Sequence, residues 1–198
     1  LAERHAQRAI ELNPGYSTGH LVYSVILGAT GRIREAIEQD RIAVSLDPLS
    51  MIVNWNASRA LYMAGRLPEA VAQLRRAVQL DPTAPLAQRM LGHLYEESGW
   101  YDATIATFAK WLPGGESNPD LVRLRRAYAS EGATGYWRAM LELESRPQPT
   151  TPENHVRVAM IYLKLGDRAN ALTWLERGLA AHTGDMLFVG VEPSLAPL

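Results

Sequence analysis

Three residues that lie close together in the sequence have side chains of the kind that hold metal ions or move protons: His93, Glu96 and Glu97. Spacings of three and four residues place them on one face of a helix, and imidazole and carboxylate groups are both ligands for zinc. Zinc-binding helices carry a second histidine four residues from the first, and none stands there. We therefore interpret the cluster as a polar stripe on a helix surface and not as a metal site.

A second group of charged side chains has the chemistry to bind phosphate: Arg123, Arg125 and Arg126. Leu121 and Leu124 are interleaved with these arginines. This pattern is typical of the solvent-facing side of an amphipathic helix, and we interpret the run as surface.

The motifs of nucleotide-binding and catalytic sites give no support for an enzyme. The sequence contains neither of the glycine-rich phosphate-binding patterns, G-x-G-x-x-G and G-x-x-x-x-G-K-[ST]. It also does not indicate the alternating strands on which a serine hydrolase is built. There is no cysteine, which removes disulfides, thiolate metal sites and cysteine nucleophiles together. We expect a protein that is not an enzyme, with no catalytic residue, cofactor or metal.

The composition is that of an ordinary globular chain. Hydrophobic residues make up 47% of the 198 residues and charged residues 21%, and the formal net charge is −1. A nearly neutral chain has no long-range field that attracts nucleic acid or an acidic membrane, and no apolar run approaches the roughly 18 residues of a membrane span. We expect no nucleic-acid or membrane partner, and a cytoplasmic location.

These side chains lie within a sequence element that repeats along the chain. Pro14, Pro48 and Pro82 are each separated by 34 residues, and a fixed period of this kind is the signature of a repeat architecture. Further columns keep the same step: Gly31, Gly65 and Gly99; Ala9, Ala43 and Ala77; Ile10, Val44 and Val78.

Each period predicts a pair of helices. Residues 17–29 and 33–46 have apolar residues at helical spacing, and Thr30-Gly31-Arg32 interrupts them. Glycine supplies the positive φ with which helices commonly end, and Pro48 ends the second helix because proline has no N–H. Alanines such as Ala36 and Ala43 would let the two helices approach closely, and a larger side chain there would overpack.

These columns resemble those of the tetratricopeptide repeat (TPR) family. The matching positions are Gly92, Tyr95, Ala36, Ala70, Phe108, Ala43, Ala77 and the closing prolines. The resemblance implies an all-α helix-hairpin solenoid, a TPR superhelix of about 10–11 antiparallel helices with a C-terminal capping segment. The chain is also similar to TPR arrays attached to bacterial signalling proteins and transcription regulators.

We expect a single solenoid over residues 1–198. Residues 1–14 are expected to be a partial repeat, 15–48, 49–82 and 83–112 TPR repeats, and 118–146 a degenerate helix hairpin. Residues 152–182 are expected to form another TPR repeat and 183–198 a capping tail. Because the sequence begins with Leu1 inside a helical pattern, we expect it to be a fragment of a larger protein.

In TPR arrays the first helix of each repeat lines a concave groove, which implies a set of partner-binding residues here. These are Leu21, Val25, Ile52, Trp55, Arg59, Tyr62, Met63, Arg89, His93, Glu96 and Glu97. The arrays that hold a chaperone's C-terminal carboxylate use basic residues and asparagines at five places. The equivalent places here hold Leu21, Val25, Asn56, Leu86 and Met90, of which only Asn56 matches. We expect a ligand with apolar or aromatic character instead.

His20 and Asp40 fall on columns that face the interior of the first hairpin in this family. Buried polar groups need partners, and we expect the two to hydrogen-bond to each other in a structural role.

The resemblance leaves two functions open. One is a protein–protein interaction scaffold that binds in its groove a peptide or helix, either from another protein or from another domain of the same parent protein. The alternative is a structural spacer or dimerisation arm for a signalling or DNA-binding domain. The sequence does not determine the oligomeric state.

Overall fold

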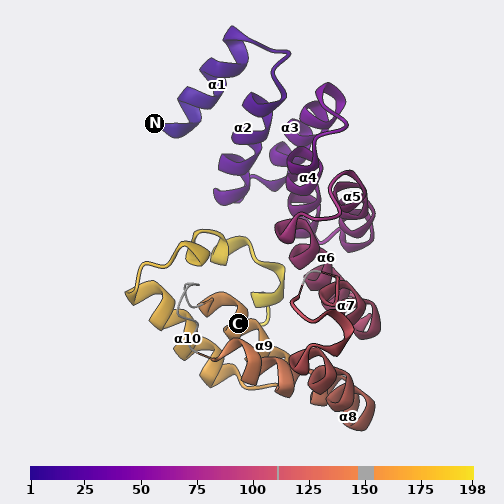
Figure 1. Ribbon diagram of the computed structural model, residues 1–198. Helices are drawn as coiled ribbons and strands as arrows, with labels where there is room; N and C mark the ends of the chain where they lie inside the picture. The colour runs from indigo at the N-terminus through magenta and orange to yellow at the C-terminus, as the bar shows by residue number, and fades with distance from the viewer. Residues whose placement is uncertain (111, 147–153) are drawn as a thin grey trace. The chain divides into compact units, whose positions relative to one another are not determined.

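The computed structural model describes residues 1–110, 112–146 and 154–198, and these residues form helices and loops without a strand. The prediction of an all-α fold is confirmed (Figure 1). The α-helices are α1 (Ala2–Leu12), α2 (Ser17–Ala29), α3 (Ile33–Leu46), α4 (Met51–Met63), α5 (Leu67–Leu80), α6 (Pro85–Glu97), α7 (Tyr101–Phe108), α8 (Pro119–Glu144), α9 (His155–Lys164) and α10 (Arg168–Ala180). Three short 3-10 helices are η1 (Gly115–Ser117), η2 (Gly184–Val191) and η3 (Pro193–Leu195).

The chain divides into two compact units. Unit 1 comprises Leu1–Ser98 with α1 to α6, and unit 2 comprises Gly99–Leu198 with α7 to α10 and the three 3-10 helices. The hairpin expected over residues 83–112 therefore has its first helix in unit 1 and its second in unit 2. Whether all residues belong to one continuous solenoid stays a prediction.

The turns inside the first two hairpins have the same hydrogen bonds. The amide of Arg32 donates to the carbonyl of Leu27 at 2.9 Å, and Arg66 donates to Leu61 at the same distance. These six-to-one bonds define a Schellman end, which requires positive φ at the preceding residue. Gly31 and Gly65 have φ of 78° and 71°, so the glycine column is explained by backbone geometry.

The alanines that occupy the repeat columns of α3 and α5 are completely buried in the helix packing of unit 1. Ala36, Ala43, Ala70 and Ala77 have no accessible surface. A methyl group is the largest side chain that such contacts between tightly packed helices accept without moving them apart. The predicted role of these alanines in close helix packing agrees with their complete burial.

A hydrogen bond to the loop before each hairpin also repeats. His20, Asn54 and Gln88 occupy one column, and each side-chain nitrogen bonds the carbonyl oxygen of the proline six residues earlier, at 3.0, 3.2 and 3.0 Å. The second helix supports this contact, since Gln73 Nε2 donates to Asn54 Oδ1 at 2.7 Å. The column therefore ties the start of every first helix in unit 1 to the loop before it.

Unit 2 departs from the regular repeat. Helix α7 has eight residues, whereas α3 and α5 have 14 each. Thr104, which replaces an alanine of the repeat, is buried and its hydroxyl donates to the carbonyl of Trp100 at 3.2 Å. Trp111, which also replaces a repeat alanine, lies outside the described residues. So do residues 147–152 of the proline-containing loop 146–152, which we expect to join the degenerate hairpin to the last repeat.

Helix α8 contains the predicted break between two helices. Asn118 caps it, with Oδ1 accepting from the amide of Asp120 at 2.9 Å. Gly132 interrupts the helical backbone with φ 62° and ψ −145°, where the sequence predicts that a first helix stops. Residues before and after Gly132 pack into one core with α7 and α9, whose largest buried members are Trp137, Tyr136 and Phe108.

We predict that Gly132→Ala lowers the free energy of unfolding by about 1–3 kcal/mol, because side chains other than glycine rarely adopt this backbone conformation. Chemical denaturation measures the change. Thr134→Ala, at an exposed position two residues later, is the control and should remain near the wild-type value. If the denaturation midpoint of Gly132→Ala equals that of wild type, α8 can adopt helical backbone angles at residue 132 without loss of stability.

We predict that Asn54→Ala lowers the free energy of unfolding by about 1–3 kcal/mol, because it removes the hydrogen bonds that the buried amide makes with the Pro48 and Ser50 carbonyls and with Gln73 Nε2. Gln79→Ala, an exposed glutamine on α5, is the control and should be nearly neutral. Equal thermal midpoints of the two variants would contradict the structural role of this column.

Candidate partner-binding surface

The expected groove residues all lie on the first helices of the hairpins in unit 1. We call them the first-helix face: Leu21 and Val25 on α2; Ile52, Trp55, Arg59, Tyr62 and Met63 on α4; Arg89, His93, Glu96 and Glu97 on α6.

Most of this face is accessible, although two expected contact residues are not. Ile52 is 43% exposed, Arg89 is exposed and Trp55 is half-buried. Tyr62 and Glu96 are only 5% and 2% exposed. These two side chains have little surface for a partner, because they pack inside unit 1 and support their neighbours on the face.

A polar network lies beneath the face between α2, α3 and α4. Asn56 Nδ2 donates to Asp40 Oδ1 at 2.7 Å and to Ser24 Oγ at 3.2 Å. Asn56 Oδ1 in turn accepts a hydrogen bond from Arg59 Nη2 at 3.0 Å. Asn56 therefore uses its amide inside the protein and connects the buried carboxylate to the arginine of the face.

Burial dominates the electrostatics of this network. Asp40 is buried, and desolvation raises the pKa of its carboxyl to about 6, although hydrogen bonds from Ser24 and Asn56 and the charge of Arg59 oppose this rise. Desolvation also lowers the pKa of Arg59, against the attraction of Asp40. Removing both charges from water is unfavourable, and each favours the ionised form of the other.

Arg59 covers the indole of Trp55, with Cζ 5.6 Å from the ring centroid. This is a cation–π distance, and the bond to Asn56 holds the guanidinium in place. The buried Nε1 of Trp55 and Oδ2 of Asp40 make no hydrogen bond with a described residue. The arrangement presents a fixed aromatic and cationic pair at the surface.

The His/Glu cluster adopts the predicted helical arrangement and joins Tyr62. His93 Nε2 lies 3.3 Å from Tyr62 Oη, and the two rings meet edge to face at 5.3 Å. His93 Nδ1 is 3.7 Å from Glu96 Oε2. In the part of the chain that the structure describes, no group of three or more acidic or histidine side chains could hold a metal ion.

The expected hydrogen bond between His20 and Asp40 is wrong. Both are buried, but His20 Nδ1 pairs with Gln39 Oε1 at 2.8 Å and Nε2 with the Pro14 carbonyl at 3.0 Å. Gln39 is adjacent to Asp40 on α3, and its longer side chain reaches the histidine. Asp40 therefore turns to Asn56 on the next first helix, a partner that sequence reasoning considered only as a clamp residue.

Residues 15–19 match the letters of the G-x-S-x-G nucleophile elbow, a match that the sequence reading overlooked. Ser17 is the first residue of α2, and the described chain before it is α1 and a loop. A nucleophile elbow joins a strand to a helix, so this serine lacks the required context.

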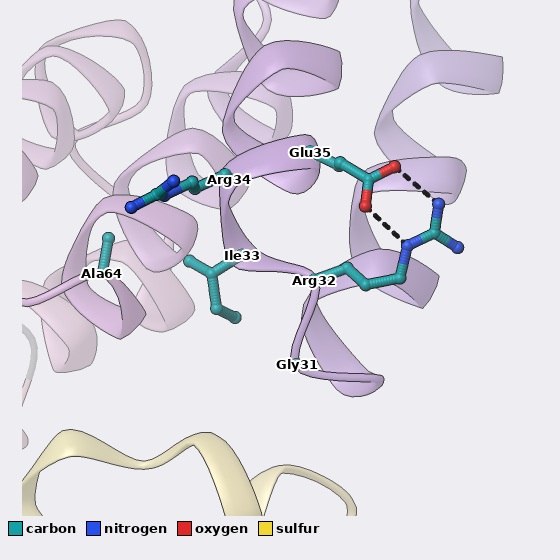
Figure 2. A pocket seen from close by; sticks show the side chains of 6 residues that line it. All are labelled: Gly31, Arg32, Ile33, Arg34, Glu35 and Ala64. Carbon is teal, nitrogen blue, oxygen red and sulfur yellow. Dashed lines mark hydrogen bonds and ion pairs between the residues drawn. The ribbon is translucent and has the colours of Figure 1, made fainter.

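A shallow pocket lies at the turn between α2 and α3 (Figure 2). Arg32 makes two hydrogen bonds to Glu35, at 2.7 and 2.6 Å, and also contacts Glu3 on α1. These bonds, chiefly that to Glu35, raise the pKa of Arg32 above its usual range. Because Arg32 is already paired with Glu35 and Glu3, its charge indicates a link between α1 and the turn and not a ligand site.

No helix among the described residues is both long and apolar enough to cross a membrane.

Family comparisons agree with the geometry. A TPR repeat model matches residues 59–99, and a tetratricopeptide repeat model matches residues 152–181. These matches show that the chain carries TPR repeats. A search of curated proteins found no match.

Solved TPR structures share its fold. YrrB, described as a TPR protein with an unusual peptide-binding site, is 16% identical over 94% of this chain and 97% of its own, with a TM-score of 0.54. PilF of Pseudomonas aeruginosa is 21% identical over 93% and 85% of the two chains, with a TM-score of 0.56. MamA is 19% identical over 91% and 86%, with a TM-score of 0.52.

The raised pKa of Asp40 predicts a pH dependence of stability. The pKa is about 6 when folded and 3.8 in its ordinary state, so the folded TPR chain binds this proton more tightly than the unfolded chain. The free energy of unfolding should fall by about 2–3 kcal/mol as pH rises from about 4 to about 6, and remain lower above that range.

Asp40→Asn should remove this decrease, because asparagine remains neutral at every pH. Denaturant titrations at pH 4, 5 and 7 measure the difference between the variant and wild type. Asp102→Asn, at an exposed position on α7, controls for the general loss of one carboxylate. Parallel curves for wild type and Asp40→Asn would contradict the role of buried Asp40.

Proposed function

We propose that this TPR array is a protein–protein interaction scaffold that holds a segment of a partner along the first-helix face, and that it is not an enzyme. The TPR fold supports a scaffold function. The partner is a peptide segment or a helix with apolar or aromatic character, from another protein or another domain of the same parent protein.

The observation that carries this proposal is the Trp55–Arg59 pair. Tryptophan and arginine are enriched among the residues that contribute most to protein interfaces, and here their relative positions are fixed before a partner binds. Asn56 holds Arg59, and Arg59 lies over the ring of Trp55. A side chain that is already ordered loses less conformational entropy on binding.

The apolar residues of the face favour a partner of similar character. Leu21 and Val25 on α2 are half-buried, and Ile52 on α4 is exposed. Burying them against apolar side chains is favourable in proportion to the area removed from water. That YrrB, with the same fold, is described as having a peptide-binding site also supports a peptide ligand.

The experiment compares partner capture by wild type and by Trp55→Ala/Arg59→Ala, followed by titration of the purified partner. Loss of two central interface residues should weaken binding by about 30-fold or more. The matched control is Arg41→Ala/Leu46→Ala, which removes an arginine and an exposed apolar residue from α3 and should bind as wild type. Equal affinity of all three proteins would place the partner elsewhere.

The alternative function, a spacer or dimerisation arm, gives a different result in the same series. A dimerisation arm that uses Trp55 would be a dimer by light scattering, and the Trp55→Ala/Arg59→Ala variant would be a monomer. A wild-type monomer that binds its partner through this face supports the scaffold.

A further inference from the structure

The last hairpin carries the columns of the first-helix face a second time. Gly166 and Ala171 occupy the same columns as Gly31 and Ala36, 135 residues earlier. With this register, Val156 of α9 corresponds to Leu21, and Met160 to Val25. The same two columns contain Trp55 and Arg59 on α4, and Arg89 and His93 on α6.

Among α2, α4, α6 and α9, these two columns are buried on α9 alone. On α2, α4 and α6 all six of their residues are half-buried or exposed. On α9, Val156 is 8% and Met160 is 5% exposed. Something in unit 2 therefore covers the part of α9 that corresponds to the proposed binding surface.

The apolar residues that pack with Val156 and Met160 come from α9 itself, from α10 and from the C-terminal segment of the same chain, residues 184–198. This segment runs from the end of α10 back to α9 (Figure 1). Leu195 is buried in one apolar cluster with Val156 and Met160, and Met186, Val189 and Leu198 pack against that cluster. We call residues 184–198 the tail segment.

A glycine in α10 allows this close packing. Gly178 lies in the alanine column of Ala43 and Ala77, and a Cβ atom built on it would lie 2.8 Å from Met186 Sδ and 2.8 Å from His155 Cβ. Both distances are shorter than real contacts allow, so an alanine would force the side chains of Met186 and His155 to move. The hairpin thus departs from its own repeat at the position where the tail segment is seated.

The tail segment resembles a bound peptide more than a further repeat helix. It forms the 3-10 helices η2 and η3 with a proline at the start of η3. Its backbone bonds are local, such as Met186 N–H to the Thr183 carbonyl and Leu195 N–H to the Glu192 carbonyl, both at 3.1 Å. Leu187 is 63% exposed, and Glu192 is the only charged residue between Met186 and Leu198.

We infer that the face of α9 formed by Val156 and Met160 is a second docking surface, for a short apolar, proline-containing segment, and that the tail segment occupies it in the absence of a partner. A partner with a segment of this chemistry binds there by replacing the tail segment. The inference rests on the proposed function, because it assigns the same task to the same columns of a different hairpin.

Because the tail segment is covalently linked to the hairpin that it covers, only a partner segment that binds α9 strongly enough can replace it. A segment linked to its own site acts at an effective concentration on the order of millimolar, so a free peptide must compete with it. Releasing the tail segment should therefore increase the affinity for an added peptide. The contacts of α9 with an added peptide should then depend on Met160.

The probe is a fluorescently labelled synthetic peptide with the sequence of residues 184–198, titrated against the full chain by fluorescence anisotropy. Leu195→Asp should release the tail segment and bind the peptide at least tenfold more tightly than wild type. Leu187→Asp makes the same change at the exposed leucine and should bind as weakly as wild type. Adding Met160→Ala to Leu195→Asp should lower the affinity again by at least tenfold.

Leu195→Asp could also destabilise the last hairpin, so backbone hydrogen exchange is measured as a second test. Peptide added in excess to wild type should speed exchange in residues 186–198 and leave α9 protected. In Leu195→Asp, the same peptide should restore the protection of α9. Equal peptide affinity of Leu195→Asp and wild type, or no restored protection, would overturn the inference and make the tail segment an integral part of the hairpin.

A final variant separates this inference from the proposed function. Trp55→Ala/Arg59→Ala, placed in the Leu195→Asp background, should leave peptide affinity unchanged, because those residues are not on α9. Loss of peptide binding in that variant would show that the peptide uses the first-helix face and would overturn the assignment to α9. The two tests are independent: the peptide can replace the tail segment on α9 even if Trp55 and Arg59 prove not to bind a partner.

Discussion

The close approach of neighbouring helices is the constraint on which this structure depends. Ala36, Ala43, Ala70 and Ala77 are completely buried at a step of 34 residues. Methyl groups at these places let each helix pack against its neighbours at a short distance, and a larger side chain would separate them. Because each hairpin buries its apolar surface only against adjacent helices, the geometry of one contact is repeated along the chain.

This packing leaves little room for polar groups, and those that are buried bond to one another. The repeated bond from His20, Asn54 or Gln88 to a proline carbonyl fixes where each first helix of unit 1 begins. Asp40 is different, because it has a carboxylate inside a hairpin and its pKa is raised by burial. The bonds that partly compensate for this cost also orient Arg59 over Trp55, so the interior network and the proposed surface are physically connected.

Unit 2 shows how the same columns can have a different environment. Val156 and Met160 stand where unit 1 has residues such as Trp55 and Arg59, yet they pack with the tail segment. An apolar helix face that lacked such a cover would expose its core positions to water. In this hairpin the chain covers its own columns, whereas the equivalent columns of unit 1 remain accessible.

The sequence by itself determined the helices, their breaks and the family, because these depend on local periodicity and backbone geometry. Glycine at 31 and 65, asparagine at 118 and the break at Gly132 each have a local physical cause. Only the tertiary structure decided which side chains meet across helices. It paired Asp40 with Asn56 and His20 with Gln39, buried Tyr62 and Glu96, and placed Leu195 against α9. A repeat pattern states which column a residue occupies, but its burial depends on neighbouring side chains that lie far away in the sequence.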